Sequence, residues 1–110
     1  MENMDFISTL VIEFNGEVKA ISEKNYKEAL KALDFGITIS ENDNELIDER
    51  IGELIENWPN RSDKSYETFK EFEEKYENYQ EQLAENKEFI RKCENTIELI
   101  EKFADLREWE

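Results

Sequence analysis

The chain contains no histidine, and its 110 residues include only one cysteine, one proline and three glycines. Without histidine it lacks the commonest general base and the commonest metal ligand, so serine–histidine and cysteine–histidine nucleophile pairs are excluded. Cysteine–histidine zinc sites are excluded for the same reason. The scattered glycines cannot form a loop that cradles phosphates. We therefore predict a protein that is not an enzyme and that holds no metal and no cofactor.

The single cysteine, Cys93, rules out a disulfide within the chain and is typical of a reducing compartment. Residues 1–14, MENMDFISTLVIEF, lack the basic start of a signal peptide, and polar residues interrupt their apolar run. This segment does not read as a membrane span either. We expect a cytoplasmic protein of a bacterial host cell that does not contact membranes.

Basic residues are scarce, because 14 lysines and arginines stand against 29 acidic residues and give a net charge of −15. Along the sequence the excess is even, with 14 acidic and 6 basic residues in 1–62 and 15 and 8 in 63–110. A body of this charge repels nucleic acids and anionic membranes and attracts basic surfaces. Direct nucleic-acid binding is therefore not expected. A basic protein or complex that itself holds nucleic acid, such as a nuclease, is the expected partner.

The first half of the sequence indicates a β-hairpin. Residues 6–14 are rich in β-branched and aromatic side chains, and Asn15-Gly16 follows them at once. This dipeptide accepts the positive φ values that a two-residue hairpin loop requires. We predict strands at 6–14 and 17–22 in the register that pairs Phe14 with Glu17, Ile12 with Lys19 and Leu10 with Ile21.

Helical spacing of apolar residues follows at 23–35 and again at 40–58. Gly36 stands where a left-handed residue would end the first of these helices, and 37–39, Ile-Thr-Ile, resembles a short third strand. The prediction for residues 1–60 is a small α+β domain of order ββαβα, with the hairpin alone or a three-stranded sheet.

Residues 61–110 are predicted to form a long acidic helical segment, so the whole chain is α+β and dominated by helix. From residue 63 onward there is no glycine or proline, and coiled-coil-like heptads run through the segment. We call their first and fourth positions the seam: Phe69, Phe72, Tyr76, Tyr79, Leu83, Asn86, Ile90, Cys93, Ile97, Ile100, Ala104 and Arg107.

The heptads favour one long helix over a helical hairpin that turns near 84–87. Asn86 is a polar residue within the seam, where it can fix the register of packed helices. Towards the C-terminus the apolar face widens, so we expect those turns to dock onto the N-terminal domain or onto another copy of the chain. A homodimer through this helix is therefore an open alternative.

Two rows of acidic residues are candidates for binding a basic partner. The first acidic row lies on the predicted helix 40–58, and the second lies opposite the seam at alternating spacings of four and three. The alternative interpretation of each row is the solvated outer face of a surface helix. The first row is Asp43, Glu45, Asp48, Glu49, Glu53 and Glu56, and the second is Glu67, Glu71, Glu74, Glu81, Glu85 and Glu88, with Asn78 at the one position of the second row that is not acidic.

Aromatic residues of the C-terminal half are further candidates for partner contacts, because aromatic anchors dominate many interfaces. The alternative interpretation is ordinary packing within the protein. The candidates are Tyr66, Phe69, Phe72, Tyr76, Tyr79 and Trp109.

In size, negative charge, lack of catalytic residues and richness in Asn, Lys, Glu and Ile, the chain resembles the small acidic proteins with which bacteriophages block host nucleases. Anti-CRISPR proteins and DNA mimics are among them. The resemblance implies a phage anti-defence inhibitor that blocks a nucleic-acid site or a required conformational change. Two alternatives stay open: a coiled-coil structural adaptor, and an immunity protein or antitoxin that neutralises a basic toxin.

Overall fold

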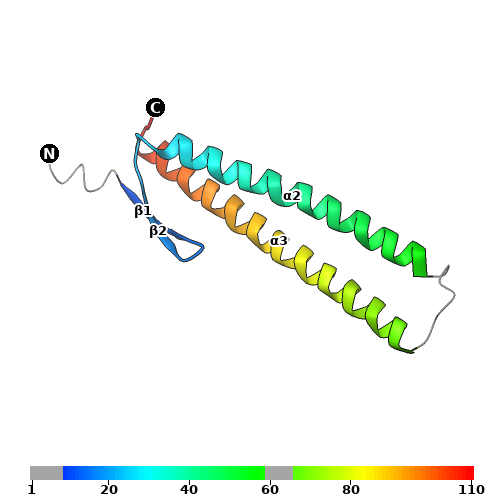
Figure 1. Ribbon diagram of the computed structural model, residues 1–110. Helices are drawn as coiled ribbons and strands as arrows, with labels where there is room; N and C mark the ends of the chain where they lie inside the picture. The colour runs from blue at the N-terminus through cyan, green and yellow to red at the C-terminus, as the bar shows by residue number, and fades with distance from the viewer. Residues whose placement is uncertain (1–8, 59–65) are drawn as a thin grey trace. The chain divides into compact units, whose positions relative to one another are not determined.

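A computed structural model describes residues 9–58 and 66–110 of the chain. In chain order these residues form strands β1 (Leu10–Phe14) and β2 (Glu17–Ile21), followed by helices α2 (Tyr26–Asn57) and α3 (Tyr66–Leu106) (Figure 1). The fold is dominated by two long helices and carries a small two-stranded antiparallel sheet. This confirms the predicted α+β class and its predominance of helix.

The predicted hairpin is confirmed in its register, which pairs Phe14 with Glu17, Ile12 with Lys19 and Leu10 with Ile21. Asn15 has φ 51° and Gly16 has φ 80°, as a two-residue loop whose twist matches the strands requires. The strands are shorter than predicted, since β1 begins at Leu10 and residues 6–8 lie outside the described residues.

The predicted third strand is wrong, because residues 37–39 lie inside α2. Gly36 does not end a helix either. Inward-facing residues continue at spacings of three and four on both sides of this point, with Leu33 and Ile37 half-buried and Ser40 and Ile47 buried. A continuous packed face outweighs the weak strand preference of two isoleucines and a threonine.

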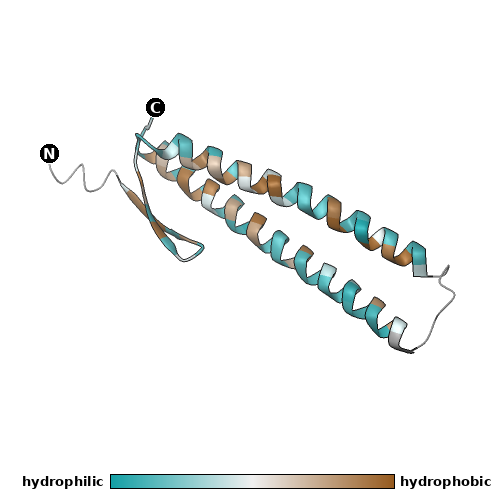
Figure 2. Ribbon diagram, viewed as in Figure 1, coloured by the Kyte–Doolittle hydropathy of each residue, from teal (hydrophilic) through white to brown (hydrophobic). Residues whose placement is uncertain are grey.

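The described part of the C-terminal segment is one helix of 41 residues, so the alternative of a turn near 84–87 is wrong. Seam residues include the best buried residues of α3, namely Leu83, Cys93, Ile100 and Ala104. Figure 2 shows hydrophobic positions recurring between hydrophilic ones along both helices.

Helix α3 ends in a Schellman motif. The Trp109 N–H donates to the Ala104 carbonyl at 2.9 Å, and the Glu108 N–H donates to the Asp105 carbonyl at 3.2 Å. Glu108 takes the left-handed conformation, with φ 56°. The motif folds the Trp109 ring back onto Phe103, with ring centroids 5.2 Å apart.

The chain divides into two compact units. Unit 1 comprises residues 1–38 and 90–110, and unit 2 comprises residues 39–89. In unit 1 the hairpin and the start of α2 share a core with the last turns of α3, built from Ile12, Ile21, Tyr26, Ile100 and Ala104. These C-terminal turns thus pack on the N-terminal hairpin. The domain boundary predicted at residue 60 falls outside the described residues.

Unit 2 contains an antiparallel pair of helical segments, one from α2 and one from α3 (Figure 1). Ile47 of α2 and Leu83 of α3 are buried in it. The Asn86 side-chain amide donates to the Asp43 carboxylate at 2.7 Å, which joins the two helices directly.

Candidate functional site

Both acidic rows belong to unit 2. The first row lies on α2, and all six of its carboxylate residues are exposed. The second row lies on α3, where Glu71, Glu74, Glu81, Glu85 and Glu88 are exposed. Glu67 is the second residue of α3, and its side chain lies outside the described residues. The fold therefore gathers into one unit two sets that are separated in the sequence by the ten residues 57–66.

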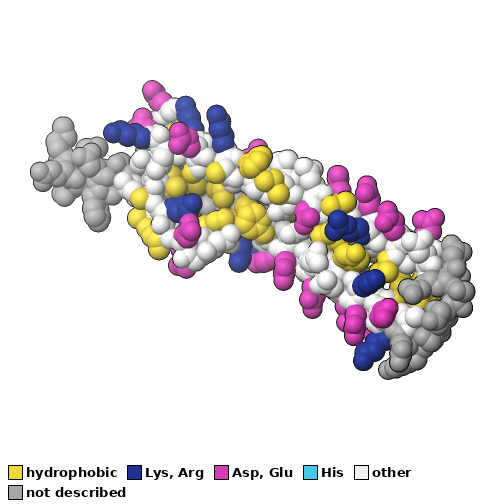
Figure 3. Space-filling model, viewed as in Figure 1, with side chains coloured by type: hydrophobic (Ala, Val, Ile, Leu, Met, Phe, Trp, Pro, Cys, Tyr) yellow, Lys and Arg dark blue, Asp and Glu magenta, His cyan; other side chains and the backbone are white. Residues whose placement is uncertain are grey.

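The two rows do not merge into one surface. On each helix most of the row lies on the side away from the residues packed between the helices, such as Ile47 on α2 and Leu83 on α3. The outer sides of two packed helices face in opposite directions. Figure 3 shows acidic side chains along both long edges of unit 2, in the right half of the view, with hydrophobic and basic side chains between them.

Negative charge is concentrated in unit 2. It carries 16 acidic and 6 basic residues, a net charge of −10, whereas unit 1 carries 13 and 8, a net charge of −5. Counting charges in the two halves of the sequence hides this difference, because unit 1 takes residues from both halves, 1–38 and 90–110. Two thirds of the net charge thus lies in the unit that holds both rows.

An aromatic cluster lies in unit 2 between the end of α2 and the start of α3. The centroid of the Trp58 ring lies 5.1 Å from the ring centroid of Phe72 and 5.9 Å from that of Phe69. The Phe72 ring stacks on the Tyr76 ring, with centroids 6.4 Å apart. Phe69 remains 47% exposed. Trp58 is not among the aromatic candidates that the sequence suggested. Its position directly after α2 and shortly before α3 is the feature that could have placed it with the aromatic residues at the start of α3.

The other aromatic candidates lie apart from this cluster. Trp109 belongs to unit 1, where its ring is 5.1 Å from Tyr26. Tyr79 lines an open hollow of about 410 Å³ in unit 2, together with Arg50, Leu54 and Lys75. Tyr66 opens α3, and its side chain lies outside the described residues. The structure therefore brings together Phe69, Phe72 and Tyr76 but not Trp109.

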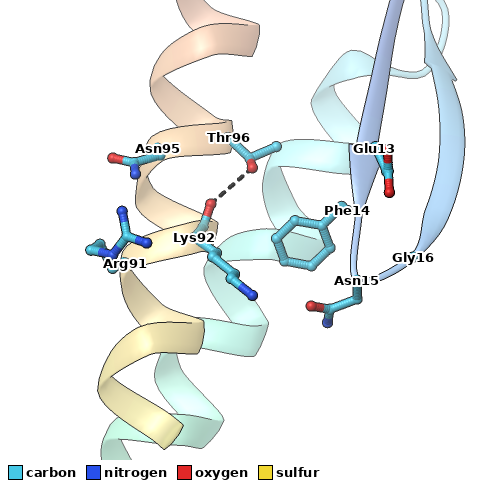
Figure 4. Close-up of a pocket in the computed structure, with 8 residues that line it drawn as sticks. All are labelled: Glu13, Phe14, Asn15, Gly16, Arg91, Lys92, Asn95 and Thr96. Atoms are coloured by element: carbon cyan, nitrogen blue, oxygen red, sulfur yellow. Dashed lines mark hydrogen bonds between the residues drawn. The ribbon is translucent and has the colours of Figure 1, made fainter. Parts of the chain in front are cut away.

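A second open hollow, of about 440 Å³, lies in unit 1 between the hairpin loop and α3 (Figure 4). The Lys92 side chain extends towards Phe14 and Asn15, and Arg91 and Asn95 also line the hollow. The Thr96 hydroxyl donates a hydrogen bond at 2.8 Å to the Lys92 carbonyl, which lies four residues earlier in α3. Six of its eight lining residues carry polar or charged side chains.

Among the residues that the structure describes, no group of three cysteine, aspartate or glutamate side chains is arranged to hold a metal ion. No helix in the described part of the chain is both long enough and apolar enough to cross a membrane.

Cys93 is buried in α3, with 1% of its surface exposed. Removal from water raises the pKa of its thiol, and the neighbouring Glu94 carboxylate raises it further. Thiolate formation is thereby disfavoured, which describes a structural cysteine and not a redox-active one.

We expect Cys93 to react with a disulfide reagent at pH 8 at least tenfold more slowly in the native protein than in urea.

The raised pKa also means that the folded state holds the Cys93 thiol proton more tightly than the unfolded state. The stability from this group is therefore complete below a pH of about 8.5 and is lost as the pH rises above it. Urea denaturation at pH 7 and pH 9.5 measures this loss, and Cys93→Ala should reduce it. If the Cys93 thiol reacts with the disulfide reagent at the same rate in the native protein and in urea, the assignment of Cys93 as a buried structural cysteine is contradicted.

No protein-family model, no curated protein and no solved structure matches this chain.

Proposed function

We propose that this protein is a non-enzymatic inhibitor that binds a basic, nucleic-acid-handling protein through unit 2. The observation that carries the proposal is the net charge of −10 in unit 2, with the carboxylates of both rows exposed wherever their side chains are described. The resemblance to small acidic phage inhibitors of nucleases supports the same assignment. The site of action would be the cytoplasm of a bacterial host cell.

The charge density of unit 2 approaches that of a nucleic-acid strand. The part of α3 in unit 2, residues 66–89, is about 36 Å long at a helical rise of 1.5 Å per residue. A net charge of −10 over that length is roughly one charge per 4 Å, whereas one DNA strand carries one per 3.4 Å. A basic channel that is built for nucleic acid would attract this unit electrostatically.

The arrangement of the rows favours a cleft over a flat surface. Because the rows lie on opposite edges of unit 2, a flat basic patch can contact only one of them. A channel with two basic walls contacts both. Long-range attraction would accelerate encounter, and the partly exposed Phe69 of the aromatic cluster would supply apolar contact area.

Four Glu→Gln substitutions in the second row, at Glu71, Glu74, Glu81 and Glu85, test this proposal. The matched control carries Glu→Gln at four exposed positions of unit 1, namely Glu23, Glu28, Glu94 and Glu101. Both variants change the net charge from −15 to −11. We expect the row variant to bind its partner at least tenfold more weakly and the control to bind within about threefold of the parent protein.

The partner is obtained by capture from bacterial lysate with the tagged protein, followed by elution with increasing salt. The decisive readout is whether the purified partner releases labelled DNA when the protein is added. Nanomolar binding that does not change between low and high salt would exclude electrostatic steering. Equal loss in both variants would show that net charge matters and that the row does not.

An immunity protein or antitoxin would use the same physics against a basic toxin, and rescue of cells from the captured partner identifies that case. A coiled-coil adaptor predicts a different outcome, in which capture recovers only the chain itself as an oligomer that resists salt.

A further inference from the structure

Strand β2 is an exposed edge strand. Four of its five residues, Glu17 to Ala20, are exposed, whereas β1 places Ile12 in the core of unit 1. In the part of the chain that the structure describes, β2 pairs only with β1. Val18 is 72% exposed, and Val11 on the same face of the sheet is 65% exposed. An unpaired edge with apolar side chains is a template for another strand.

The peptide groups available on this edge follow from the register. Residues that flank a two-residue hairpin loop exchange hydrogen bonds, and such pairs then alternate with pairs that do not. Glu17, Lys19 and Ile21 therefore direct their peptide groups towards β1. Val18 and Ala20 direct theirs to the open side.

We propose that a second copy of this chain binds to this edge, with the two β2 strands antiparallel and related by a two-fold axis at Val18. In this register the two Val18 residues form a hydrogen-bonded pair, in which the N–H of each Val18 donates to the Val18 carbonyl of the other copy. Glu17 of each copy then lies opposite Lys19 of the other, in a pair whose side chains approach closely. The strand is thus complementary to itself in charge, as an interface between identical copies requires.

Neighbouring symmetric registers lack this match. An axis at Lys19 places two lysines opposite each other, and an axis at Ala20 places Lys19 opposite Ile21 and leaves Glu17 without a partner in β2 of the second copy. Like charges directly opposite each other destabilise a sheet. The charges of β2 therefore select the register centred on Val18.

The interface is small, so the dimer is weak, with a dissociation constant on the order of 100 µM. Each copy carries a net charge of −15, and this long-range repulsion opposes the contact. Added salt screens the repulsion and should strengthen self-association. Binding to a basic partner through unit 2 would respond to salt in the opposite direction, so failure of the dimer and failure of the proposed inhibition are distinguishable.

Sedimentation equilibrium of the full chain at 50 mM and 500 mM salt tests the proposal. We expect Lys19→Glu to weaken dimerisation at least tenfold, because Glu17 then faces a glutamate of the second copy. Adding Glu17→Lys to that variant should restore the dimer, since the exchanged charges match again. Lys31→Glu, an exposed site of unit 1 on α2, is the control for the change in net charge.

Val18→Pro is an independent test, because it removes an N–H that points away from β1 and leaves the hairpin bonds in place. It should abolish dimerisation with an unchanged circular dichroism spectrum. A chain that stays monomeric at millimolar concentration in 500 mM salt would overturn the proposal. A dimer that tolerates both Lys19→Glu and Val18→Pro would also overturn it and would place self-association elsewhere, such as on α3.

Discussion

Replacement of Ile100 by alanine is expected to lower the free energy of unfolding of unit 1 by about 3–5 kcal/mol. Ile100 has no exposed surface, and it shares the core of unit 1 with Ile12, Ile21 and Tyr26. Truncation removes buried apolar contacts, and the hairpin and two helices around the site limit collapse into the cavity. A loss of this size is a large fraction of the stability of a domain of this length.

The two tryptophans allow the effect to be assigned to a unit, because Trp58 belongs to unit 2 and Trp109 to unit 1. Urea denaturation of Ile100→Ala is followed by Trp109 fluorescence in a Trp58→Phe background. Leu106→Ala is the control on the same helix, since Leu106 is 81% exposed and its loss should change stability by less than about 0.5 kcal/mol. Similar midpoints for the two variants would contradict the described core.

Replacement of Asn44 by leucine is expected to raise the free energy of unfolding by about 1–3 kcal/mol. Asn44 lies on the inner side of α2 in unit 2, and its amide oxygen is buried without a hydrogen-bond partner. A buried acceptor without a donor costs the energy of its lost hydration. Leucine removes that cost and adds apolar surface to the contact between the helices.

Asn42→Leu is the matched control, because Asn42 is exposed two residues away on the same helix. It should change the urea midpoint little, whereas Asn44→Leu should raise it. Trp58 fluorescence in a Trp109→Phe background reports on unit 2. If Asn44→Leu lowers the midpoint instead, the amide makes a hydrogen bond in solution that leucine removes.

The hairpin was predictable in detail from local chemistry. Asn15-Gly16 specifies a two-residue loop, and such a loop fixes the pairing of every residue in the two strands. The single long α3 was also predictable, because no residue after position 63 interrupts a helix and one apolar register runs through it. In both cases the information lies within a few neighbouring residues.

The predicted strand at 37–39 failed because local and non-local signals disagree there. Ile37 and Ile39 favour strand, and Gly36 suggests the end of a helix. Packing of Leu33, Ile37, Ser40 and Ile47 along one side of α2 decides for helix. That packing depends on the partner helix, which a short window of sequence does not contain.

By itself, the sequence determined the helix-dominated class, the hairpin register, the lack of histidine chemistry and the total charge of −15. Only the tertiary structure decided how that charge is distributed. The return of α3 joins residues 90–110 to the hairpin, and it leaves both acidic rows in unit 2, on opposite edges of a helix pair. Composition and periodicity are properties of neighbouring residues, whereas the gathering of charge depends on which distant segments bury their apolar faces together.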